Sequence, residues 1–337
     1  MSASRQFFRI FAAFLVAAVL LFLVNRYLVL WLDWPDLGSV FDYFAADSGM
    51  TTPQLLQGLG LWLLYIVTAL LIVRWVRRTP DTGLNDDAQL YQRMTLFVVR
   101  AAFWSVFLVG LVDATLSFLR VEELLEPALG EHWAGLLDQP RSRGLYVHYP
   151  LIALSLVIAW FTRSLGFIWL AMLVVLAEFS IVLSRFIFSY EQAFMGDLVR
   201  FWYASLFLFG SAYTLAEGGH VRVDVIYAGM RKRTQAWVNA IGSLLLGLPL
   251  CWTILLMGMG NKQGSLVAPL INFEISQSGY GMYVKYLMAS FLLVFAVSMA
   301  IQFVSYFLHS VAIIRGEIAP DDEHDMEDVV VQVKEAV

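Results

Sequence analysis

The chain has little charge and almost no cysteine. Asp, Glu, Lys and Arg make up only 15% of its 337 residues, and Cys251 is the single cysteine. One cysteine excludes an internal disulfide and any metal site built from several thiolates. Soluble domains carry about 25% charged residues, so the low charge indicates that part of the surface faces lipid rather than water.

The sequence also lacks the short motifs of common enzyme classes. It contains no H-E-x-x-H, no G-x-S-x-G and no glycine-rich phosphate loop. A membrane haem needs two histidines that face each other, and His148 and His309 are predicted to lie on opposite sides of the membrane. We therefore expect a protein that is not an enzyme, binds no cofactor or metal and has no nucleic-acid partner.

Apolar residues are in excess instead, at 60% of the chain, and the mean hydropathy is +0.71. A helix that crosses a bilayer needs about 20 mostly apolar residues. We therefore predict an all-α integral membrane protein with about eight transmembrane helices, in contact with membrane lipids. The predicted spans are roughly 8–30, 55–73, 96–119, 145–162, 166–188, 198–216, 236–257 and 284–308.

Basic residues in short loops predict the orientation of these spans. The 31–54 loop contains four aspartates and no Lys or Arg. Basic residues gather before the first span and in every second loop: Arg5, Arg9, Arg74, Arg77, Arg78, Arg93, Arg222, Arg231, Lys232, Arg233 and Arg315. This alternation predicts that both termini are cytoplasmic. The 120–144 loop departs from it, because Arg120, Arg141 and Arg143 lie on the predicted outer side.

Two pairs of small residues predict close helix contacts. Gly110 with Ala114 and Ser243 with Gly247 lie four positions apart inside predicted spans. Small side chains at this spacing let two helix backbones approach each other.

Two carboxylates fall inside predicted spans, where a charge costs a few kcal/mol. Glu178 lies near the middle of the fifth span, and Asp113 lies in the outer half of the third. One interpretation is a proton or cation relay. The other is an acid that is hydrogen-bonded across helices or paired with a base such as Arg185.

The stretch "AEGGHVRVDV", residues 216–225, follows the apolar run of the sixth span. Gly218 and Gly219 are typical of a helix C-terminus, where a residue without Cβ adopts the left-handed conformation. The following residues are amphipathic on helical spacing, and the basic cluster 231–233 can reach water or lipid phosphates. We interpret this segment as an elbow at the membrane surface.

The longer segment "FLFGSAYTLAEGGHVRVDVIYAGMRKRTQAWVN" resembles the signature of the small membrane subunit, DctQ type, of tripartite ATP-independent periplasmic (TRAP) transporters. The resemblance also covers "SRFIF" and "FEISQSGYGMYVKYLMASFLLVFAVSMAIQFV", and together it extends over about 165–315. At 192–202 the family usually has Trp and paired Glu, whereas here Asp197 stands alone. The resemblance selects eight matching positions: Arg185, Gly210, Gly219, His220, Arg222, Asp224, Glu274 and Lys285. Asp197 is added as the acidic residue at the position where the family pattern differs.

This resemblance implies three parts of the chain. They are an N-terminal four-span extension of unknown role at 1–150, a DctQ-like four-span domain at 165–315 and an acidic cytoplasmic tail at 316–337. It also implies a location in the bacterial inner membrane and two partners, a large DctM-type membrane subunit and a periplasmic substrate-binding protein. The chain would then brace the large subunit of a sodium-coupled importer of an organic acid, with the matched residues at a subunit interface or in a structural motif.

Other functions remain open at this point. The main alternative is a self-contained secondary transporter or channel that uses Glu178 and Asp113 along its path. A third possibility is a membrane enzyme or a redox subunit that carries haem.

Overall fold

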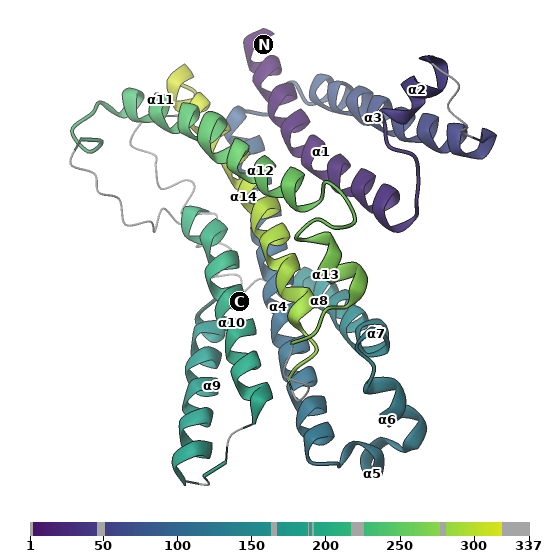
Figure 1. Ribbon diagram of the computed structural model, residues 1–337. Coiled ribbons are helices and arrows are strands. Elements are labelled where there is room, and N and C mark those ends of the chain that lie inside the picture. Colours follow the sequence, from purple (N-terminus) through teal and green to yellow (C-terminus); the bar gives the residue numbers. More distant parts are fainter. Residues whose placement is uncertain are drawn as a thin grey trace. The chain divides into compact units, whose positions relative to one another are not determined.

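A computed structural model (Figure 1) describes residues 3–45, 51–162, 167–187, 189–190, 192–216, 226–276 and 281–318. Within these ranges every regular element is a helix, which confirms the all-α prediction. The elements are α1 (Ala3–Trp31), α2 (Ser39–Ala45), α3 (Thr52–Arg78), α4 (Leu84–Val121), α5 (Leu125–Leu129), α6 (Glu131–Leu137), α7 (Pro140–Arg143), η1 (Gly144–His148), α8 (Tyr149–Phe161), α9 (Phe167–Ile187), α10 (Ala193–Ala216), α11 (Lys232–Gly242), η2 (Ser243–Gly247), α12 (Leu248–Gly258), α13 (Val267–Asn272) and α14 (Lys285–Arg315).

Seven helices in the described part of the chain are long and apolar enough to cross a membrane. They are α1, α3, α4, the continuous segment Pro140–Phe161, α9 over Ile168–Ile187, the continuous segment Lys232–Gly258, and α14. The chain is therefore a multi-pass membrane protein. The remaining predicted span, 198–216, does form the 24-residue helix α10. It is less apolar than the others because it contains Asp197, Arg200 and several Ser, Tyr and Gly residues.

Both π-helical turns, η1 and η2, end two positions before a proline. The backbone N–H of Tyr149 bonds to Gly144 O in η1, and that of Leu248 bonds to Ser243 O in η2. Pro150 and Pro249 follow. Proline has no N–H and its ring clashes with the carbonyl four residues earlier in an α-helix. A π turn bonds residues five apart, and this wider turn moves that carbonyl away from the ring.

The chain forms two compact units. Unit 1 contains residues 1–91, 223–262 and 300–322, and unit 2 contains residues 92–222, 263–299 and 323–337. Each unit takes residues from both the predicted N-terminal extension and the predicted DctQ-like segment. The division of the sequence near residues 150 and 165 stays a prediction, as does the orientation of the termini.

Unit 1 contains a buried arginine that sequence analysis counted among the basic residues before the first span. Arg9 on α1 is fully buried, and its Nε donates to Asp87 Oδ2 of α4 at 2.6 Å. Its Nη2 donates to Thr79 Oγ1 at 2.9 Å, just after α3. Arg9 is therefore a buried charge and not one exposed to water. Its charge is neutralised by Asp87, so it ties α1 to the end of α3 and the start of α4.

Close helix packing occurs at both predicted small-residue pairs. In unit 1, a Cβ on Gly247 would lie 2.7 Å from the ring of Phe303 in α14. In unit 2, a Cβ on Gly110 would overlap the indole of Trp202 in α10. That indole crosses one turn of α4, and its Nε1 donates to Val106 O at 3.2 Å. The glycine therefore makes room for a ring that joins α4 to α10, and α10 in turn packs along α9 (Figure 1).

This packing predicts the effect of adding one methyl group. Gly110→Ala forces the Trp202 ring away from Val106 O, and we expect a loss of about 1–3 kcal/mol of stability, the usual cost of overpacking. Gly60→Ala on α3 is the control, because a Cβ there meets nothing within 4 Å and alanine favours helix by up to about 1 kcal/mol. Thermal unfolding of the purified subunit in detergent measures both. A Gly110→Ala variant that melts at or above the wild-type temperature would contradict the packing described.

Candidate functional site

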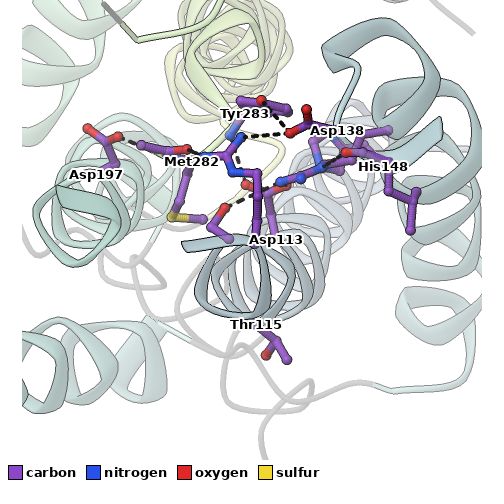
Figure 2. Close-up of polar contacts among 12 residues, drawn as sticks. Asp113, Thr115, Asp138, His148, Asp197, Met282 and Tyr283 are labelled. Atoms are coloured by element: carbon purple, nitrogen blue, oxygen red, sulfur yellow. Dashed lines mark hydrogen bonds and ion pairs between the residues drawn. The ribbon is translucent and has the colours of Figure 1, made fainter. Parts of the chain in front are cut away.

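The strongest concentration of buried charge lies around Asp113 on α4, in unit 2 (Figure 2). The carboxylate is fully buried and accepts three hydrogen bonds. Arg143 Nη1 lies 3.2 Å and His148 Nε2 3.0 Å from Oδ1, and the backbone N–H of Tyr283 donates to Oδ2 at 2.9 Å. Asp113 therefore has a cation, a histidine and a backbone donor around it, all from other segments.

The local fold brings the two basic partners to the same side. Arg143 ends α7 and His148 ends η1, five residues later. Hydrogen bonds in a π-helix join residues five apart, so this turn lets both side chains reach Asp113. Gly144 lies between them, where a Cβ would come within 2.9 Å of the Tyr286 hydroxyl. A glycine is thus required for this segment to approach α14 so closely.

Arg143 is also fully buried and bonded on several sides. Its Nε donates to Leu137 O at 2.7 Å, and its Nη1 also donates to Ser117 Oγ at 3.3 Å. The guanidinium carbon lies 4.2 Å from the centre of the Tyr283 ring, a cation–π distance. Because Asp113 and Arg143 carry opposite charges, the pair as a whole is neutral.

His148 connects Asp113 to Tyr286 of α14. Its Nδ1 lies 2.8 Å from the Tyr286 hydroxyl, and the two rings stack with centroids 5.8 Å apart. A carboxylate can only accept, so we assign a proton to Nε2 of His148, which donates to Asp113.

The outer rim of the site is built on Tyr283. Arg120 lies 4.3 Å from its ring centre, and Arg120 Nη2 donates to Gly281 O at 2.8 Å. The Tyr283 hydroxyl donates to Asp138 Oδ1 at 3.5 Å, and Arg120 Nη1 lies 3.9 Å from the same oxygen. Burial raises the pKa of Tyr283, although Arg120 and Arg143 oppose that shift. The hydroxyl therefore stays protonated and can donate at neutral pH.

Two carboxylates meet consecutive backbone amides just before α14. Asp113 accepts from the N–H of Tyr283, and Asp197 Oδ2 accepts from the N–H of Met282 at 3.1 Å (Figure 2). The N-terminal end of a helix carries partial positive charge, which favours nearby anions. Asp113 of α4 and Asp197 of α10 thus hold the start of the 31-residue helix α14.

The other residues that sequence analysis selected lie elsewhere. Lys285 Nζ and Glu274 Oε1 form an ion pair at 2.6 Å, which joins two matched positions. Gly210 is buried on α10, while Arg185 is exposed near the end of α9. Glu178 is exposed on α9 and does not belong to the Asp113 site. Gly219, His220, Arg222 and Asp224 lie outside the described residues.

Sequence analysis missed most of the site, although one signal pointed to it. Arg143, His148, Tyr283 and Tyr286 were not selected as partners of Asp113. Arg120 and Arg143 had violated the expected charge of an outer loop, and the reason is now visible: both guanidinium groups are engaged in this site and are not free loop charges. A basic residue that breaks the loop pattern can thus indicate a buried ion pair.

The geometry favours a structural role for Asp113. Its side chain is fully buried and already accepts three hydrogen bonds from its own chain, so an ion would have to enter an enclosed and already bonded site. Among the described residues, no group of three or more His, Cys, Asp or Glu side chains could hold a metal ion. The arrangement joins α4, α7, η1 and the start of α14 through charge.

A double-mutant cycle tests this role. Asp113→Leu leaves Arg143 buried without its anion, and Arg143→Leu leaves Asp113 without its cation. Each single change should cost about 3–5 kcal/mol, while the double variant should cost less than the sum. The control is Thr115→Val: Thr115 points away from the site (Figure 2) and its hydroxyl donates to Leu111 O of its own helix. Thermal unfolding in detergent reads out all four variants. Additive losses, or single variants as stable as Thr115→Val, would contradict the ion pair's role.

Comparison with protein families identifies the C-terminal part of the chain. Residues 171–312 match the model of the family described as "Tripartite ATP-independent periplasmic transporters, DctQ component". The matched residues include α10 and most of α9 and α14. Comparison with curated proteins and with solved structures gave no match. Residues 171–312, less than half of the chain, are therefore similar to the DctQ component of these transporters.

Proposed function

We propose that this chain is the bracing subunit of an ion-gradient-driven importer of an organic acid in the bacterial inner membrane. Its partners are a large DctM-type membrane subunit, which carries substrate and sodium, and a periplasmic binding protein, which delivers the substrate. The DctQ match supports this assembly. In this proposal the chain itself binds neither the substrate nor the coupling ion.

The observation that carries the proposal is that Asp113 is buried and hydrogen-bonded by groups of its own chain. A coupling-ion site in a membrane normally uses broken helices with free carbonyls or carboxylates next to a cavity. The two oxygens of Asp113 instead accept hydrogen bonds from Arg143, His148 and the Tyr283 amide, and the side chain is not exposed to solvent. A chain that uses its buried charge to fix helices is suited to be the immobile part of a transporter.

The same observation weakens the alternative of a self-contained transporter. That mechanism required Asp113 and Glu178 along one path. The two differ in environment, since Asp113 is enclosed among α4, η1 and the start of α14, whereas Glu178 is exposed on α9. They are not neighbours in a common cavity among the described residues. We also propose that the segment 216–225, interpreted above as an elbow at the membrane surface, docks on the large subunit.

Reconstitution separates the two functions. We expect this chain to copurify with the large membrane subunit when the two are co-expressed. Proteoliposomes with both should take up an organic acid from a tested panel only when the binding protein and a sodium gradient are present, without ATP. Proteoliposomes with this chain alone are the control, and uptake by them would contradict the proposal. So would a large subunit that transports at the full rate without this chain.

A further inference from the structure

One membrane helix exposes almost its whole length. Within the span Ile168–Ile187 of α9, only 11% of the most apolar window is buried. Large apolar side chains recur every three or four residues along one side, so they form a continuous strip on the helix. We call this strip the α9 stripe; it consists of Ile168, Met172, Val175, Phe179, Val182 and Phe186.

A carboxylate interrupts this apolar surface. Glu178 is exposed and lies beside the stripe, three residues from Val175 and four from Val182. It is eleven residues from the start of α9 and nine from its end, which places it about 15 Å from either end of the helix. The hydrocarbon core of a bilayer is about 30 Å thick, so Glu178 lies near the midplane. Within the described part of the chain it makes no hydrogen bond or ion pair.

Lipid tails are an unfavourable neighbour for this group. They offer no hydrogen-bond donor, and acidic residues in membrane helices usually face protein. Helix α3 shows what a lipid-compatible surface of this protein looks like. Its span is also only 11% buried, yet residues 52–73 contain no Asp, Glu, Lys or Arg. The hydroxyl of Thr68 there donates to Leu64 O of the same helix. The exposed face of α9 therefore carries a carboxylate near its middle, whereas residues 52–73 of α3 carry no charge.

We propose that a transmembrane helix of the large membrane subunit covers the α9 stripe and places a lysine, arginine or amide donor against Glu178. The inference rests on the proposed function for the identity of the partner. Charge complementarity defines what the partner must offer: an apolar helix surface with one donor at mid-membrane depth. The stripe supplies the packing surface, and Glu178 fixes the depth at which the two helices engage.

A second copy of this chain does not meet that requirement. Two copies inserted in the same direction are related by an axis along the membrane normal, so each residue stays at its own depth. Glu178 of one copy would then face the same depth in the other, where α9 again carries Glu178. The basic residue of α9, Arg185, lies seven residues further on, about 10 Å away along the membrane normal. Like charges at one depth would oppose a contact between two copies.

Site-specific photocrosslinking in membranes tests the contact directly. The full chain is co-expressed with the large subunit, with a photoreactive residue at Phe179 on the stripe or, as background control, at Leu63 on α3. Both positions are exposed in membrane helices. We expect an adduct with the large subunit at Phe179 in clear excess over Leu63. Adducts of Phe179 with lipid alone, adducts with this chain itself, or equal yields at the two positions would each overturn the proposal.

Substitutions of Glu178 test the requirement for a donor. Glu178→Gln keeps an acceptor oxygen and should retain most copurification. Glu178→Lys opposes the donor and should lower it by about tenfold or more. The control Val67→Lys places a lysine on the exposed face of α3, and recovery is normalised to the amount of this chain in the membrane. Equal recovery of Glu178→Lys and wild type would overturn the docking inference, as would an equal loss with Val67→Lys. Failure of the wild-type chain to copurify would instead reject the proposed function.

Discussion

The buried carboxylate of Asp113 sets the requirement that the surrounding structure meets. A charge in the interior of a membrane protein needs an opposite charge or several hydrogen-bond donors close by. Asp113 obtains them from segments that lie 30, 35 and 170 residues away along the chain. Meeting this one requirement brings α7, η1 and the start of α14 onto α4. The glycine at 144 permits this close approach, and the π turn lets Arg143 and His148 both reach Asp113.

This use of charge has a functional consequence. In the described part of the chain, buried ion pairs connect helices, as in Arg9 with Asp87 and Asp113 with Arg143. Groups committed in this way are poorly suited to bind and release ions in a transport cycle, because each release would leave a buried partner without its counter-charge. Glu178 differs because we propose that its hydrogen-bond donor lies on the large membrane subunit. Both features agree with a subunit that fixes helices in place while another subunit moves substrate.

The sequence was sufficient for the helices and for the family but not for the site. Long apolar runs predict membrane helices because the bilayer imposes a length and a composition on each span. Seven helices within the described residues meet both conditions. Glu274 and Lys285, two positions selected by the resemblance, form an ion pair in the structure. The partners of Asp113 could not be predicted, because contacts over such separations depend on packing rather than on local pattern. Arg9 shows the same limit: counted by position it flanks a span, yet packing buries it.

The central claim is that the Asp113 site holds helices together and does not move during transport. Hydrogen exchange measures this most directly at the backbone amides of Met282 and Tyr283, which donate to Asp197 and Asp113. In the reconstituted complex, we predict slow exchange in the peptide that contains them, unchanged when substrate-loaded binding protein and a sodium gradient are added. Faster exchange there under transport conditions would contradict the account, because it would show that the site opens as part of the cycle.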